Sequence, residues 1–184
     1  MYYRINIAGL ERDLKICPLN EELSIAGFVM FGDVEITRHA AAELLKRAPA
    51  FDVMITAESK GIPLVYEMAR QIGMNRYLLA RKGVKAYMSD VVKCEVNSIT
   101  TQHRQTLYLD GADAAYMKGK RVLIVDDVIS TGESLSALEH LVQQAGGEIV
   151  GRMAVLAEGD ARDRHDITYL AYLPLFHADG TAIE

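Results

Sequence analysis

The sequence has few cysteines, and none lies in a pattern that would staple a fold or bind a metal. Cys17 and Cys94 do not form a Cys-x-x-Cys pair, and neither has a histidine at metal-ligand spacing. We therefore expect two free, reduced thiols and neither a disulfide scaffold nor a zinc site. The five histidines also show no triad-like or metal-like spacing, which favours packing or surface roles for them.

The sequence also lacks an apolar run long enough to span a bilayer. Residues 1–6 show no basic start leading into an apolar stretch and a cleavage site, so we expect a cytoplasmic protein with no membrane partner. Lys and Arg number 20 against 25 Asp and Glu, which gives a formal net charge of −5. Because general binding to phosphate backbones needs a basic face, we expect no nucleic-acid partner.

Linkers rich in proline, glycine or serine are absent too, and the four prolines are scattered along the chain. Half of the 184 residues are hydrophobic, which is enough for one substantial core. We therefore expect residues 1–184 to form a single domain.

Apolar runs alternate with helical patterns along most of the chain. This order predicts an α/β fold with a mostly parallel central sheet flanked by helices. Continuous apolar runs predict buried strands, and apolar residues at helical spacing predict helices, the first with Thr37 as its N-cap. The predicted strands are 51–57, 77–80, 121–125 and 149–156, and the predicted helices are 37–47, 61–72 and a segment after Gly132.

Two stretches break this alternation. Residues 1–36, with a strand-like piece near 28–31, are expected to form a small N-terminal cap or edge element. Residues 82–110 are expected to leave the sheet, because 91–96 and 106–109 could pair as an antiparallel hairpin. Long excursions in compact domains are often functional, so we interpret 82–110 as a flexible hairpin lid.

The most informative segment is 122–134, in which a buried strand is followed by two acids and a turn into a helix. In open α/β sheets, ligands bind beyond the carboxyl ends of the strands, so Asp126 and Asp127 are expected at the mouth of a site. Their carboxylates can accept hydrogen bonds from vicinal hydroxyls. Backbone N–H groups of 130–134 converge at a helix N-terminus, where Gly132 permits close approach of a phosphate. A ribose phosphate would satisfy both ends.

This segment, Val122 to Ser134, resembles the 5-phosphoribosyl-1-pyrophosphate (PRPP) motif of the type I phosphoribosyltransferase family. The resemblance implies that family's fold and the transfer of a phosphoribosyl group to a base. It also implies that Asp126 and Asp127 hold the ribose hydroxyls. Mg²⁺ is expected to be held mainly by PRPP oxygens, with Asp126 or Asp127 helping and no protein cage. The implied 5′-phosphate loop consists of Ser130, Thr131, Gly132, Glu133 and Ser134.

A second turn, Glu58-Ser59-Lys60-Gly61, follows the predicted strand 51–57 and opens the next helix. Backbone donors there, together with the charge of Lys60, can form another anion cradle. The family resemblance assigns the pyrophosphate of PRPP to this turn, with Ser59, Lys60 and Gly61 as its binding residues. The alternative is a solvated lysine in a tight turn.

The third candidate is the basic stretch 81–104, which resembles the mobile loop of the family. Arg81 and Lys82 are predicted to bind PRPP, and Lys85 and Arg104 are predicted catalytic residues of the lid. A closing positive lid would neutralise departing pyrophosphate and exclude water. The alternative for each residue is an ordinary solvated charge. Among the histidines, His103 is set apart because it lies in this proposed lid.

The base is expected to meet the loop after 149–156, where Glu158 can accept a hydrogen bond from a 6-amino group. Relatives that take 6-oxopurines resemble one another in having a lysine near this loop. Here the loop carries Glu158 and no lysine, so adenine is favoured. However, residues 97–107 resemble xanthine phosphoribosyltransferases and a purine-operon repressor. A 6-oxopurine enzyme and a PRPP sensor without turnover therefore remain alternatives, with an orotate enzyme a weaker one. The family resemblance also implies a homodimer.

Overall fold

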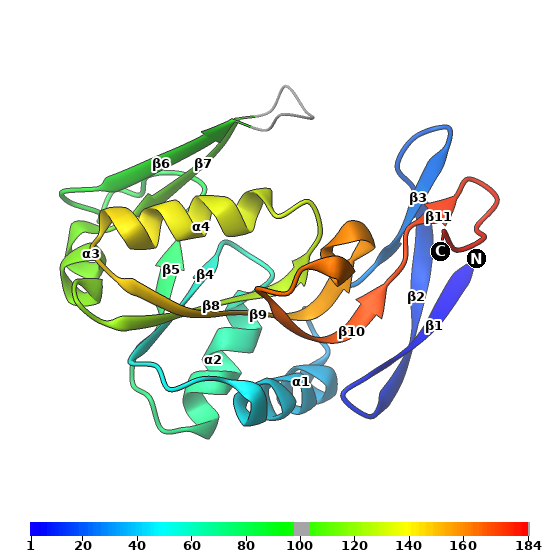
Figure 1. Ribbon diagram of the computed structural model, residues 1–184, viewed down its shortest axis with the longest axis horizontal. Coiled ribbons are helices and arrows are strands. Elements are labelled where there is room, and N and C mark those ends of the chain that lie inside the picture. The colour runs from blue at the N-terminus through cyan, green and yellow to red at the C-terminus, as the bar shows by residue number, and fades with distance from the viewer. Residues whose placement is uncertain (98–103, 184) are drawn as a thin grey trace.

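The computed structural model describes residues 1–97 and 104–183, and for residues 96, 97, 104 and 105 it describes the backbone only. Its centre is a five-stranded parallel sheet with the strand order β10-β9-β8-β4-β5, which confirms the predicted α/β fold (Figure 1). Every residue of β4 is buried, as expected for a central strand covered on both faces. The five strands are β4 (Val53–Ala57), β5 (Leu78–Ala80), β8 (Arg121–Ile129), β9 (Glu148–Glu158) and β10 (Thr168–Leu173).

Helices cover both faces of this sheet. Successive residues of a strand point to opposite faces, so Met54 of β4 packs in the core with α1 and α2, whereas Val53 and Ile55 pack with α3 and α4. Figure 1 shows α4 on one side of the sheet and α1 and α2 on the other. The helices are α1 (Val34–Arg47), α2 (Ile62–Gln71), α3 (Gly111–Met117) and α4 (Glu133–Gln144), and a 3₁₀ turn, η1 (Gly159–Asp163), follows β9.

The start of α1 corrects the predicted cap. The N-cap is Asp33, whose Oδ1 accepts a hydrogen bond from the Ile36 N–H at 3.0 Å. Thr37 lies inside the first turn, where its hydroxyl donates to the Asp33 carbonyl at 2.7 Å. Arg12, on β2, donates to both carboxylate oxygens of Asp33 at 2.7 and 3.1 Å. The prediction of Thr37 was wrong because this cap is also fixed by a residue distant in sequence.

The N-terminal segment is a sheet of its own. Three antiparallel strands pair in the order β1-β2-β3, and a short C-terminal strand, β11, joins the edge of β3. The strand expected near 28–31 does not form, because β3 ends at Gly27 and Phe28 and Met30 are buried in the core beyond it. Both chain termini lie at this sheet (Figure 1). Its strands are β1 (Tyr2–Ile7), β2 (Leu10–Pro18), β3 (Leu23–Gly27) and β11 (Phe176–His177).

The hairpin predicted within 82–110 is confirmed. Strands β6 (Val92–Asn97) and β7 (Arg104–Leu109) pair antiparallel, and they lie over α4 in Figure 1. Leu107 and Leu109 are fully buried, so the end of the hairpin nearest the sheet is built into the core. Residues 98–103, including His103, lie outside the described residues.

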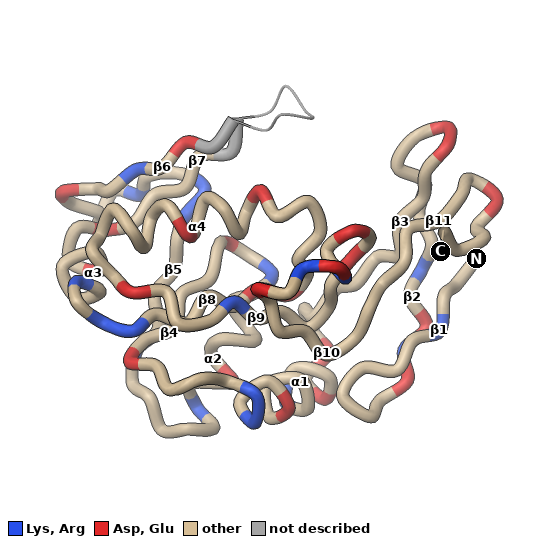
Figure 2. The backbone as a smooth tube through the Cα atoms, viewed as in Figure 1, with Lys and Arg blue, Asp and Glu red and all other residues tan. Residues whose placement is uncertain are grey.

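Charge on this excursion is partly compensated. Figure 2 shows acidic and basic residues interspersed along the tube. Lys93 forms an ion pair with Glu95 on the same strand, and Arg81 Nε lies 3.4 Å from Glu58 Oε2. Two basic residues of the stretch 81–104 are therefore paired with acidic residues, Lys93 with Glu95 and Arg81 with Glu58. Within the described part of the chain, no helix is long and apolar enough to cross a membrane.

Candidate active site

The candidate site lies where the order of the parallel strands reverses. The chain passes from β4 to its neighbour β5 and later returns to β8 on the other side of β4. Pairing of β4 with β8 ends at Ile55 and Ile124, whereas β8 stays paired with β9 as far as Ile129. The carboxyl ends of β4 and β8 therefore diverge, and such a divergence is the usual ligand crevice of an open α/β sheet.

This geometry corrects the predicted position of the paired acids. They do not end the strand, because β8 continues through Asp126 and Asp127 with β9 as its partner. The acids instead occupy the stretch of β8 that has lost β4. They consequently lie at the inner wall of the crevice, and Asp127 is only 4% exposed.

The two acids are in direct contact. The Asp127 N–H donates to Asp126 Oδ1 at 2.9 Å. Burial of the Asp126 carboxyl, and then the negative charge of Asp127, raise the pKa of Asp126 far above its usual range. Asp127 Oδ2 is buried and accepts no hydrogen bond from the described residues. Its nearest cation is Lys60, whose Nζ lies 3.3 Å away as an ion-pair partner.

The turn after β4 closes the other side of the crevice. Lys60 Nζ lies 3.3 Å from Asp127 Oδ2, while its side chain remains 49% exposed. A Cβ on Gly61 would lie 2.1 Å from Thr56 Oγ1 and 3.1 Å from Asp126 Oδ1, so the packing here requires glycine. One pocket unites this turn with the acids, and its lining is Ala57, Glu58, Ser59, Lys60, Lys82, Asp126, Asp127, Val128 and Ser134.

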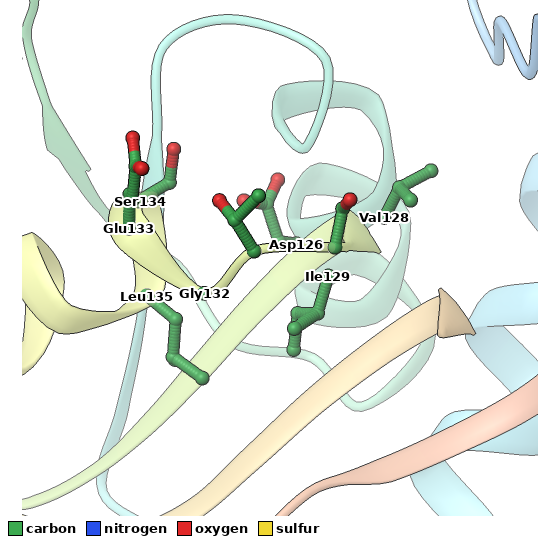
Figure 3. Close-up of a pocket in the computed structure, with 9 residues that line it drawn as sticks. Asp126, Val128, Ile129, Gly132, Glu133, Ser134 and Leu135 are labelled. Atoms are coloured by element: carbon green, nitrogen blue, oxygen red, sulfur yellow. The ribbon is translucent and has the colours of Figure 1, made fainter. Parts of the chain in front are cut away.

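The turn after β8 forms a second pocket beside the first. Gly132 has a φ of 81°, a left-handed conformation that favours glycine, and α4 begins immediately after it. Figure 3 shows the side-chain oxygens of Asp126, Glu133 and Ser134 on one side of this junction and Leu135 on the other. The N-terminus of α4 favours an anion here. The pocket is lined by Asp126 and residues 128–135, which include Ser130 and Thr131.

Only some of the predicted lid residues lie at the two pockets. Lys82 lines the first pocket, and its N–H donates to Glu58 Oε2 at 3.0 Å. That hydrogen bond is the main cause that lowers the pKa of Glu58, with smaller contributions from the nearby positive charges. Arg81 is turned to Glu58, and its backbone exchanges two 2.8 Å hydrogen bonds with Tyr108 on β7. Neither described pocket is lined by Lys85, and the side chain of Arg104 lies outside the described residues.

Glu158 ends β9 and lies close to the turn after β8. Burial raises the pKa of its carboxyl, and a hydrogen bond with the Ser130 side chain opposes that rise. The sequence placed Glu158 on the base side of the site but gave no sign of its contact with Ser130. Thr56 was also missed, although its buried hydroxyl has no hydrogen-bond partner among the described residues. A strand threonine gives no sequence signal for such a position.

A third missed residue is Arg164, which follows η1. A Cβ on Gly132 would lie 2.7 Å from Arg164 Nη1, so the guanidinium packs directly against the turn after β8. Concerning metals, no three His, Cys, Asp or Glu side chains in the described residues gather as a possible ion site. The carboxyl groups that line the first pocket, those of Glu58, Asp126 and Asp127, offer oxygen ligands of the kind that Mg²⁺ prefers.

Comparison with known proteins agrees with this geometry. Residues 34–179 match the phosphoribosyl transferase domain family. A hypoxanthine/guanine phosphoribosyltransferase of Methanotorris igneus is 31% identical over 162 residues, which cover 83% of this chain and 84% of that protein.

Solved structures of similar fold include the adenine phosphoribosyltransferase of Thermoanaerobacter pseudethanolicus. Its TM-score is 0.72 at 22% identity, over 86% of this chain and 95% of that one. The Saccharomyces cerevisiae adenine phosphoribosyltransferase, in complex with an imino-altritol bisphosphate and adenine, gives a TM-score of 0.67 at 19% identity. That match covers 86% of this chain and 92% of the other.

Proposed function

This chain belongs to the phosphoribosyltransferase family, and we propose that it is a purine phosphoribosyltransferase whose base substrate is adenine. The proposed reaction converts adenine and PRPP to AMP and pyrophosphate, a step of purine salvage. The observation that carries the proposal is the pair of adjacent acids, one of them buried, between the turn after β4 and the glycine turn at the N-terminus of α4. PRPP has the matching order of groups, with vicinal hydroxyls between a 5′-phosphate and a pyrophosphate.

Each part of PRPP has a binding partner in this proposal. The turn 130–134 binds the 5′-phosphate at the N-terminus of α4. Asp126 and Asp127 accept hydrogen bonds from the ribose hydroxyls, which adds a hydrogen bond to Asp127 Oδ2 beside its ion pair with Lys60. Ser59, Lys60 and Gly61 bind the pyrophosphate, with Lys82 on the same pocket wall.

The chemistry requires no protein nucleophile. N9 of the base attacks C1 of the ribose while the bond from C1 to the pyrophosphate oxygen breaks, and the electron pair leaves with pyrophosphate. The imidazole N–H proton of the base passes to pyrophosphate or to water. Positioning of the two reactants and stabilisation of the departing charge supply most of the catalysis. Lys60 and Lys82 lie where that charge develops. Mg²⁺, when bound with PRPP, supplies further neutralisation of the pyrophosphate, and Asp126 or Asp127 would assist in holding it.

The choice of adenine rests on Glu158. A partly buried carboxylate at the end of β9 can accept a hydrogen bond from the 6-amino group of adenine. A 6-oxo group would find no donor in an ionised Glu158, and an unpaired buried polar group costs about 1–3 kcal/mol.

The second candidate is a 6-oxopurine enzyme, and one observation favours it. The Methanotorris igneus protein, named for hypoxanthine and guanine, is more similar in sequence than the structures named for adenine. An ionised Glu158 could also accept from the N1–H of a 6-oxopurine. A third candidate, a PRPP sensor, rests on the resemblance of 97–107, most of which lies outside the described residues.

A panel of bases separates these candidates. The kcat/KM for adenine, hypoxanthine, guanine and xanthine would be measured with saturating PRPP and Mg²⁺. We expect adenine to exceed each oxopurine by about 100-fold, as loss of paired polar contacts typically gives. A preference for hypoxanthine or guanine would keep the mechanism and overturn the base assignment.

Assembly and location are further proposals. We propose a cytoplasmic homodimer. The dimer rests on the family resemblance, and light scattering of the purified protein tests it. A monomer at assay concentration that retains full activity would contradict the proposed dimer as the active form.

A further inference from the structure

Arg164 contacts the 5′-phosphate turn from outside the sequence motif. It follows η1, whereas Gly132 is the N-cap of α4 and has a left-handed backbone conformation. A Cβ at position 132 would lie 2.7 Å from Arg164 Nη1 and 3.9 Å from its Cζ. The guanidinium therefore occupies the space that any side chain at position 132 would need. The φ of Gly132 favours glycine, and the absence of a Cβ there leaves room for this guanidinium.

The orientation of Arg164 is fixed by Asp166. Arg164 Nε donates to Asp166 Oδ1 at 2.9 Å, and Arg164 Nη2 donates to Oδ2 at 2.6 Å. This bidentate pair uses one edge of the planar guanidinium and leaves Nη1 on the side of Gly132. Arg152 Nε lies 3.8 Å from Asp166 Oδ2 and also pairs with Glu139 on α4. Asp166 is thus anchored from a second side.

A cation at this turn would favour binding of a 5′-phosphate. A 5′-phosphate carries close to two negative charges near neutral pH, and the charged residue within 130–134 is Glu133. Asp126 lines the same pocket, and Glu158 hydrogen-bonds with Ser130. Lys60 and Lys82 belong to the pocket on the pyrophosphate side. Arg164, paired with Asp166, places the positive end of this ion pair against the turn itself, where partial burial strengthens its effect on an anion.

We propose that Arg164, held by Asp166, is a positioning residue of the 5′-phosphate subsite. It supports the backbone at Gly132 and adds positive charge to the N-terminus of α4. Its effect is specific to the ribose-phosphate end of the ligand, because the pyrophosphate side has its own lysines. The identity of the anion rests on the proposed function, whereas the contact of Arg164 with the turn does not.

The test measures binding of the two ends of PRPP separately. Dissociation constants of ribose 5-phosphate and of pyrophosphate, the latter with Mg²⁺, would be determined by calorimetry for the wild type, Arg164→Gln, Arg164→Lys and Asp166→Asn. We expect Arg164→Gln to weaken ribose 5-phosphate about tenfold and pyrophosphate less than about twofold. Arg164→Lys should recover part of the loss, because it restores the charge without the bidentate geometry. Asp166→Asn should act in the same direction.

A neighbouring arginine gives the matched control. Arg162 lies on η1, with its guanidinium carbon 5.0 Å from the centre of the Tyr172 ring. Arg162→Gln removes the same charge nearby and should leave both dissociation constants unchanged. Thermal unfolding of all variants shows whether any of them has lost its fold, and Arg164→Lys and Asp166→Asn keep the test decisive if Arg164→Gln does not fold.

The outcomes are separable from those of the proposed function. Unchanged ribose 5-phosphate binding in Arg164→Gln, or an equal loss for both ligands, would overturn the inference. A wild type that binds neither ligand would overturn it together with the proposed function. Ribose 5-phosphate binding that depends on Arg164, in a protein that forms no nucleotide, would support the inference and contradict the enzyme.

Discussion

Lys60 Nζ lies 3.3 Å from Asp127 Oδ2, and this ion pair joins the turn after β4 to the inner end of β8. The carboxylate is buried while about half of the lysine side chain is exposed. A buried carboxylate is costly unless a cation or hydrogen-bond donor lies beside it, and Lys60 is that cation for Asp127. The exposed part of the same cation can meet an anion in the crevice. The proposed hydroxyl and pyrophosphate subsites would therefore share one charge.

The paired acids give the first prediction. Replacing Asp126 and Asp127 together by Asn should lower kcat/KM for PRPP by about 100-fold or more, because the carboxyl groups that accept from the ribose hydroxyls are lost. The fold should survive, since the change removes buried charge. Steady-state kinetics with a thermal melt measure both effects, and Asp13→Asn on β2 is the control. Near-wild-type kcat/KM in the double variant would refute the assignment.

Lys60 gives the second prediction. Lys60→Ala should raise KM for PRPP by about tenfold and change KM for the base by less than about twofold, because the lysine faces the pyrophosphate side. Lys46→Ala, an exposed lysine at the end of α1, is the control. Equal effects on both substrates would count against a pyrophosphate role.

The shifted pKa of Asp126 predicts a pH dependence. The neutral carboxyl is favoured in the free protein by burial and then by Asp127, whereas ribose hydroxyls need an acceptor. KM for PRPP should therefore fall as pH rises through the raised pKa of Asp126. In Asp126→Asn this fall in KM should disappear, and only the pH dependence that comes from the titration of PRPP itself should remain. Identical pH profiles of the wild type and Asp126→Asn would remove Asp126 as the group responsible.

The same pKa also predicts the sign of a stability change. Because the folded-state pKa is raised above the unfolded value, the free protein loses stability as pH rises between those two values. Asp126→Asn cannot ionise, so its stability relative to the wild type should increase over that window. Urea unfolding at several pH values measures the difference, and a constant difference between the two proteins would contradict the prediction.

Gly61 gives a steric prediction. A Cβ there would meet Thr56 Oγ1 at 2.1 Å and Asp126 Oδ1 at 3.1 Å. Gly61→Ala should destabilise the fold by about 1–3 kcal/mol, a typical cost of overpacking, and should lower kcat/KM for PRPP by displacing Asp126. Gly27→Ala is the control, since its nearest contact would be an ordinary 3.7 Å. Full activity and stability of Gly61→Ala would show that the crevice can absorb a methyl group.

Local patterns explain why much of the sheet could be predicted. The run 53–57 is uniformly apolar except for Thr56, as a central parallel strand should be, and the helix α2 shows regular apolar spacing with Pro63 in its first turn. The turn at Gly132 was predictable for the same reason. Its glycine, its acids and its helix start are all adjacent in sequence.

Long-range contacts explain what could not be predicted. The acids remain within β8 because β9 pairs with it up to Ile129, which no property of residues 121–129 reveals. Asp33, not Thr37, caps α1, and Arg12 on β2 of the N-terminal sheet binds the Asp33 carboxylate. Arg164 is remote from Gly132 in sequence and belongs to no motif. Sequence could therefore indicate the motif residues of the candidate site but not the residues that pack behind them.

Product stoichiometry tests the central claim most directly. The purified protein would be incubated with PRPP, Mg²⁺ and adenine, and AMP and pyrophosphate would be quantified over time. The account predicts equal amounts of both products, formed only when base and PRPP are present together. Measurable PRPP binding without AMP or pyrophosphate, with adenine or any oxopurine supplied, would contradict it.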